Sequence, residues 1–124
     1  LVGSEMCIRD RIYTGDIEKA LNELKRAIRL DPFSHDLLYA EQGICYYWLK
    51  DYSSAIESFR KVKLIRNNLF YLSACYFEIG EVEKGNELLK EAEATTGLSS
   101  DNFIDSQSYT KSEMKDSLRL SFKR

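Results

Sequence analysis

Three segments of the chain repeat one pattern of small and apolar positions. They read GDIEKALNELKRAIRLDP, KDYSSAIESFRKVKLI and GEVEKGNELLKEAEAT, at residues 15–32, 50–65 and 80–95. Each has a small residue, a large apolar residue four positions later and a small or apolar residue three positions after that: Ala20, Leu24 and Ala27, then Ala55, Phe59 and Val62, then Gly85, Leu89 and Ala92. Steps of four and three place side chains on one face of an α-helix. The pattern therefore predicts three amphipathic helices.

The residues at the ends of these segments are typical of helix boundaries. Asp16 and Asp51 precede the first two helices, where a carboxylate accepts hydrogen bonds from the N–H groups of the first turn. Glu81 stands at the same place before the third helix and is a weaker cap. Pro32 is expected to end the first helix, because it has no N–H to donate and crowds the preceding turn.

Two further helical stretches, DLLYAEQGICYYWL and NLFYLSACYFEI, precede the second and third segments. Their key positions share the spacing three, one and three: Tyr39, Gln42, Gly43 and Tyr46 in the first, and Leu69, Leu72, Ser73 and Tyr76 in the second. The repeating unit is therefore an A helix, a tight turn and a B helix. It occurs whole at 36–65 and at 68–95, after a lone B helix at 16–31.

Small residues mark the points where paired helices are expected to cross. Helix axes 8–10 Å apart leave little room between them, so one small residue is needed on each side. We expect Gly43 to face Ala55 and Ser73 to face Gly85.

The unit resembles the tetratricopeptide repeat family, whose period is about 34 residues. The resemblance implies an all-α fold over residues 12–96, a solenoid of antiparallel helix hairpins. Ala55 and Gly85 lie 30 positions apart, so the B helix of the second unit is expected to be about one turn short. After the repeats, we expect a linker at 97–109 and a capping helix at 110–124 that covers the end of the solenoid. Thr110 and Glu113 have the spacing of a capping box, and Met114, Leu118 and Phe122 would pack on the last repeat.

The first eleven residues, LVGSEMCIRDR, resemble the translated end of a sequencing adaptor at every position. We therefore expect them to lie outside the natural protein, which would begin near Ile12 as a fragment.

Composition narrows the function classes. A net charge of −2 without a basic stripe argues against a nucleic-acid surface, and no apolar run approaches the roughly 18 residues of a membrane span. Cys45 and Cys75 hold equivalent A-helix positions and indicate a small buried slot in a cytoplasmic protein rather than a disulfide or metal site. His35 is expected to be solvated or to cap the next helix. We predict no catalytic constellation, no metal and no cofactor.

The resemblance also implies where a partner would bind, since repeats of this family bind peptides on the concave face formed by A helices. That face would carry Ala40, Ile44, Tyr47, Trp48, Phe70, Ala74 and Phe77. It lacks the Lys and Asn with which some family members hold a terminal carboxylate. Two alternatives stay open: the aromatic face grips an extended or helical peptide, or other helices or the tail cover it.

The predicted function is therefore contact, through intramolecular docking, self-association or binding of a protein or peptide. Residues 17–124, with RLDPFSHD and LRLSFKR, also resemble the C-terminal repeat tails of bacterial class III adenylate and guanylate cyclases and of winged-helix transcriptional regulators. The alternative that follows is a regulatory tail, with any catalytic or DNA-binding domain outside this sequence.

Overall fold

The computed structural model describes residues 2–31, 36–62 and 68–123, with side chains from residue 8 onward. Within these ranges every regular element is an α-helix, which confirms the all-α class. The helices are α1 (Val2–Thr14), α2 (Ile17–Leu30), α3 (Asp36–Trp48), α4 (Tyr52–Arg60), α5 (Asn68–Glu78), α6 (Val82–Thr96), α7 (Ser100–Ser106) and α8 (Ser112–Ser121).

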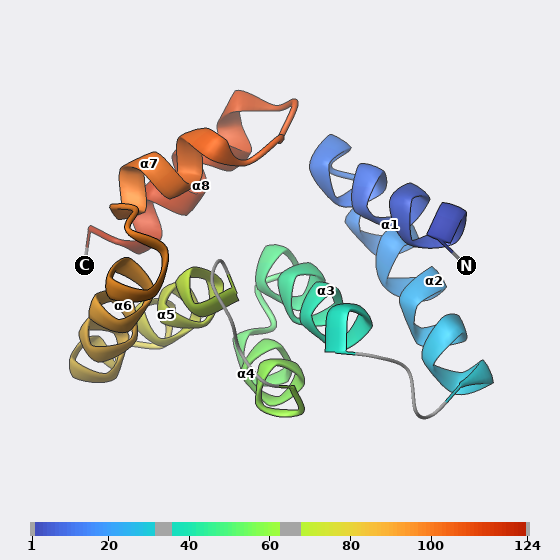
Figure 1. The fold of residues 1–124 in the computed structure, drawn as a ribbon, viewed down its shortest axis with the longest axis horizontal. Helices are drawn as coiled ribbons and strands as arrows, with labels where there is room; N and C mark the ends of the chain where they lie inside the picture. Colours follow the sequence, from blue (N-terminus) through green and yellow to red (C-terminus); the bar gives the residue numbers. More distant parts are fainter. Residues whose placement is uncertain (1, 32–35, 63–67, 124) are drawn as a thin grey trace.

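Consecutive helices pair as antiparallel hairpins, and the hairpins stand side by side in an arc. In Figure 1, α1–α2, α3–α4 and α5–α6 follow one another along the arc, while α7–α8 folds back over its inner side. α5 is packed against α3, α4, α6 and α8, and every one of its residues from 69 to 77 is buried. The repeats therefore form a curved scaffold, and the C-terminal helices lie against it.

The lengths of the B helices follow the sequence spacing. α4 has 9 residues, against 14 in α2 and 15 in α6, so the shortened second B helix is confirmed. The predicted structural positions are buried, except that Ala27, Tyr46 and Leu89 are half-buried. α2 ends at Leu30, and Pro32 lies outside the described residues.

Glycine is required at the helix crossings because aromatic rings fill them. A Cβ atom on Gly43 would lie 2.8 Å from the ring of Phe59, one turn beyond the predicted neighbour Ala55. A Cβ on Gly85 would lie 2.9 Å from the ring of Phe77, and the Ser73 hydroxyl donates to the Gly85 carbonyl at 2.8 Å. Ser73 and Gly85 therefore meet as predicted, whereas the atoms closest to a Cβ on Gly43 belong to the Phe59 ring.

We expect Gly43→Ala to destabilise the protein by about 1–3 kcal/mol, because the added methyl group overlaps the buried Phe59 ring. The overlap should outweigh the gain of up to ~1 kcal/mol in helix propensity. Urea unfolding followed by circular dichroism measures the change. Asn86→Ala, at an exposed position of α6, is the control and should not lower stability. An unchanged midpoint for Gly43→Ala would contradict the close approach.

The predicted caps are only partly correct. Asp51 accepts a hydrogen bond from the Ser54 N–H at 3.3 Å, whereas Asp16 and Glu81 stand at N-cap positions without a side-chain cap bond. The capping box at Thr110 is wrong, because its N–H and hydroxyl both donate to the Tyr13 carbonyl, at 3.0 and 3.4 Å. Thr110 thus ties the α7–α8 loop to α1.

The expected linker at 97–109 contains α7, with Ser99 as its N-cap and Asn102 N–H as the donor at 3.1 Å. A helix of seven residues is too short for its period to be read from sequence. As expected for a capping helix, α8 packs on α5, the A helix of the last repeat, through Leu118 and Phe122. The tail also runs along α3 and reaches α1, which was not expected.

Residues 2–11, which we expect to lie outside the natural protein, form most of α1. Ile8 and Ile12 are buried against the apolar face of α2 that Leu21 and Leu24 present. An exposed apolar stripe favours any helix that can cover it. The packing of Ile8 and Ile12 on α2 explains why these residues form a helix, and it assigns no function to α1.

Candidate functional site

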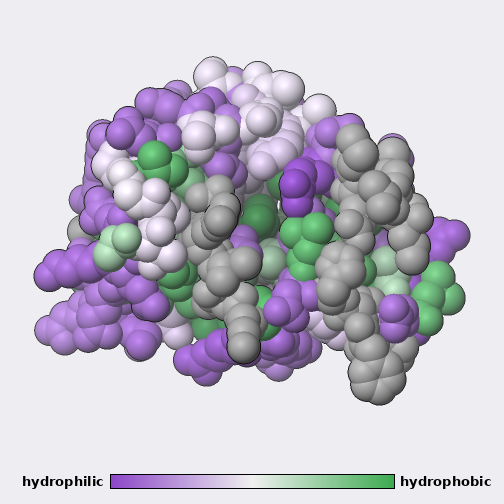
Figure 2. Space-filling model, viewed as in Figure 1, coloured by the Kyte–Doolittle hydropathy of each residue, from purple (hydrophilic) through white to green (hydrophobic). Residues whose placement is uncertain are grey.

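The structure brings the seven predicted face residues together along α3 and α5. Ala40, Tyr47, Phe70, Ala74 and Phe77 are buried, and Ile44 and Trp48 are half-buried. The face is not an open groove, because residues 99–122, here called the C-terminal segment, lie across most of it (Figure 1). The face of the molecule seen in Figure 2 is mainly polar, with apolar residues near its centre and in a few places at its edge.

Aromatic contacts join the C-terminal segment to α5. The Phe103 ring stacks on Phe70, with centroids 4.3 Å apart and planes 11° apart, and Phe103 has no exposed surface. Phe122 meets Phe70 and Phe77 edge-on, at centroid distances of 6.4 and 6.1 Å. Such pairs stabilise a contact by about 0.5–1.5 kcal/mol beyond the burial of their area.

A chain of hydrogen bonds forms the first polar anchor of the C-terminal segment. The Trp48 indole N–H donates to the Tyr109 hydroxyl at 2.8 Å, and the Tyr71 hydroxyl donates to the Gln107 side-chain oxygen at 2.9 Å. The hydroxyls of Tyr71 and Tyr109 are 2.7 Å apart. Since Tyr71 has one proton and gives it to Gln107, Tyr109 must donate to Tyr71. Each of the two tyrosine hydroxyls thus donates one hydrogen bond and accepts another.

The second polar anchor surrounds Ser121, which has no exposed surface. Its hydroxyl lies 2.7 Å from the Tyr47 hydroxyl and 2.6 Å from a Glu78 carboxylate oxygen. Because the carboxylate can only accept, Ser121 donates to Glu78 and Tyr47 donates to Ser121. Burial raises the pKa of Tyr47, and also that of Tyr71 and Tyr109, so these hydroxyls remain protonated donors.

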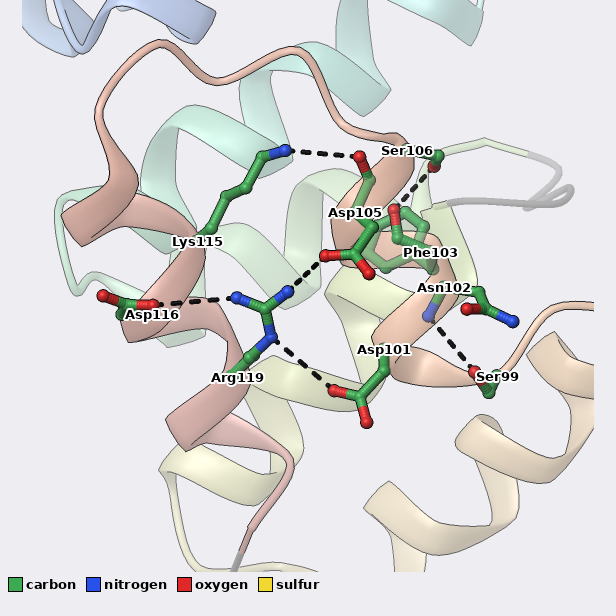
Figure 3. Close-up of polar contacts among 9 residues, drawn as sticks. All are labelled: Ser99, Asp101, Asn102, Phe103, Asp105, Ser106, Lys115, Asp116 and Arg119. Carbon is green, nitrogen blue, oxygen red and sulfur yellow. Dashed lines mark hydrogen bonds and ion pairs between the residues drawn. The ribbon is translucent and has the colours of Figure 1, made fainter.

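Charged side chains hold the two helices of the C-terminal segment together at the surface (Figure 3). Arg119 lies 3.7 Å from Asp101 and 3.6 Å from Asp116, and it also contacts the Asp105 carboxylate. Lys115 donates to the Asp105 carbonyl at 3.2 Å. Exposed ion pairs stabilise by about 0–1 kcal/mol each, so this network orients α8 on α7 more than it stabilises the fold.

The concave face continues beyond the C-terminal segment as a cavity of about 150 Å³ between α1, α3, α5 and residues 107–109. Glu41 lines it and is only 3% exposed. The Arg9 Nε lies 3.0 Å from a Glu41 carboxylate oxygen, at the edge of the cavity. This acidic residue was not among the predicted site residues, although a lone charge inside the apolar stretch DLLYAEQGICYYWL signals it.

Sequence reasoning also missed the residues that the C-terminal segment contributes: Phe103, Gln107, Tyr109 and Ser121. They lie in a polar stretch whose scattered apolar residues have no period. Tyr71 was missed because α5 is buried on all sides and so shows no single apolar face.

The two described cysteines are buried and unlinked. Burial, followed by the nearby Glu41 charge, raises the pKa of Cys45 to about 12, and burial also raises the pKa of Cys75. Thiols with raised pKa values are poor nucleophiles. In the described part of the chain, no group of three or more His, Cys, Asp and Glu residues is placed to hold a metal ion. His35 lies outside it. No helix there is long and apolar enough to traverse a bilayer.

Comparison with known proteins gives one finding. The family model described as tetratricopeptide repeat matches residues 41–64, a stretch that includes most of α3 and all of α4. No curated protein and no solved structure matches the chain.

Proposed function

Because the chain carries a tetratricopeptide repeat, we propose that it is a protein-interaction module whose concave face binds a segment of polypeptide. In this chain the bound segment is its own C-terminal segment, residues 99–122. The mechanism is binding to a preformed curved surface, and we propose no catalytic step. The two buried, unlinked thiols support a reducing compartment such as the cytoplasm.

One observation supports the proposal most directly. A segment that does not share the repeat pattern lies along α3 and α5 and is held by Phe103 and by two hydrogen-bonded anchors. Buried aromatic residues surrounded by a polar rim are typical of the residues that dominate binding energy at interfaces. The partner class that follows is a protein or peptide with aromatic side chains at corresponding places, including the same segment of a second copy.

The resemblance to the repeat tails of nucleotide cyclases and winged-helix regulators supports an alternative in which the module regulates a neighbouring domain of a longer chain. The same face would then hold the tail in place beside that domain. The reading frame upstream of Ile12 distinguishes these: a cyclase core or a winged helix supports the regulatory role, and further repeats support a scaffold.

Cutting the chain after α6 tests whether the C-terminal segment is a bound ligand of the face. A protease site is inserted after Gly97, an exposed residue whose surroundings are open within 4 Å. After cleavage we expect the fragment to co-elute with the repeats in size-exclusion chromatography. Trp48→Ala should weaken its retention by about thirtyfold, because the fragment loses its indole donor and ring contact. Lys90→Ala, exposed on α6, is the control and should change nothing.

Two results would contradict the proposal. In the first, the fragment elutes separately while the repeats remain helical, which would mean that the face does not bind it. Alternatively, cleavage of the unsubstituted chain unfolds both parts, which would mean that the segment is an inseparable part of the core.

A further inference from the structure

The large apolar side chains that are exposed among the described residues are unevenly distributed. Four of the five lie in or next to the turns that follow α3 and α5, or on α8: Leu49, Ile79, Val82 and Leu120. The end of α3, the end of α5 and α8 line one common cavity, so these positions share one edge of the repeats. The fifth, Leu30, is the last residue of α2 and is 81% exposed. Grouped apolar residues at a surface are typical of contact sites.

A hollow of about 530 Å³ opens at this edge, around the start of α6. Val82 is its large apolar residue, and its charged residues are Glu81, Glu83, Lys84 and Glu87. Lys84 lies 3.9 Å from Glu87, so one cation stands among three carboxylates and the hollow keeps a negative charge. It therefore suits an apolar side chain that is accompanied by positive charges.

The end of α2 carries this combination. Arg29 directly precedes Leu30 and Arg26 lies one turn earlier, and both arginines are exposed. Figure 1 places α2 and α6 at opposite ends of the arc. The basic apolar end of α2 and the acidic hollow of α6 therefore cannot meet within one chain, although their charges are complementary.

We propose that the chain associates with a second copy of itself, with the end of α2 of one copy docked in the hollow at the start of α6 of the other. Leu30 enters the hollow beside Val82, and the two arginines face its carboxylates. Because the two surfaces differ, the contact is head-to-tail. It does not use the concave face, so it goes beyond the proposed function.

The mass of the full chain as a function of its concentration tests the contact. In sedimentation equilibrium, the mean mass should rise above that of one chain between about 10 μM and 1 mM, because a contact of this small size is weak. Sodium chloride at about 0.5 M should weaken the association, since exposed charges are then screened. Leu30→Ser should weaken it about tenfold, because an apolar side chain is no longer buried at the contact.

Charge reversal identifies the two surfaces. The double variant Arg26→Glu with Arg29→Glu should keep the mass of one chain at every concentration, because like charges then meet at the contact. The double variant Glu83→Lys with Glu87→Lys should do the same. An equimolar mixture of the two variants should associate again, since opposite charges then face each other. Circular dichroism checks that both variants keep their helices.

A matched control separates the contact from a general effect of net charge. Lys19→Glu with Lys61→Glu changes the charge as much as the arginine variant does, at exposed positions outside both surfaces, and should associate like the unsubstituted chain. Equal loss of association in this control, a mixture that stays at the mass of one chain, or an unsubstituted chain that does so at about 1 mM would overturn the proposal. Retention of the cleaved C-terminal segment tests the proposed function separately, because none of these substitutions lies on the concave face.

Discussion

Phe103→Ala is expected to lower the free energy of unfolding by about 3–5 kcal/mol, the usual cost of removing a fully buried phenylalanine. The ring stacks on Phe70 and meets Tyr71 edge-on at 5.4 Å, so the substitution leaves a cavity between α7 and α5. Both neighbours belong to the centre of the core. Equilibrium unfolding in urea, followed by far-ultraviolet circular dichroism, measures the loss.

Leu120→Ala is the matched control on the same segment. Leu120 is 59% exposed, so its truncation should change stability by no more than about 0.5 kcal/mol. A loss below about 1 kcal/mol for Phe103→Ala would mean that the C-terminal segment is only loosely held on the concave face. The interaction proposal would then lose its main support.

The second large effect is a loss of folding stability, expected at alkaline pH. Burial raises the pKa of Cys45, Cys75, Tyr47, Tyr71 and Tyr109 above ordinary values of 9.0 for the thiols and 10.0 for the hydroxyls. The folded state therefore holds these protons more tightly than the unfolded state does. Below about pH 9 these groups are protonated in both states, so they should not make the free energy of unfolding depend on pH. Above their ordinary pKa values this free energy should fall by about 1.4 kcal/mol per pH unit for each group.

The tyrosines make this loss visible, because their hydroxyls are the anchors of the C-terminal segment. Absorbance near 295 nm reports tyrosinate and circular dichroism reports the helices, in a titration from pH 8 to about 11 with a thiol reductant present. The buried tyrosines should ionise only together with helix loss, and return to pH 7 should restore both signals. Ionisation near pH 10 of every tyrosine in an intact fold would contradict the buried anchors.

The repeats could be read from the sequence because their geometry is local. Spacings of three and four residues decide which face of a helix is apolar, so the positions of Leu24, Phe59 and Tyr76 followed directly. The short α4 followed in the same way from the spacing of Ala55 and Gly85. The role of Asp51 as a cap likewise depends on residues only three positions apart.

The sequence by itself thus determined the helices, their pairing and the small residues at their crossings, since these depend on contacts between near neighbours in the chain. Only the tertiary structure decided that the C-terminal segment, besides packing on the last repeat, continues across the concave face to α1. The contacts responsible, such as Trp48 with Tyr109 and Tyr47 with Ser121, join residues 61 and 74 positions apart. No periodic pattern encodes such single pairings, because each depends on how the folded chain places two side chains in space.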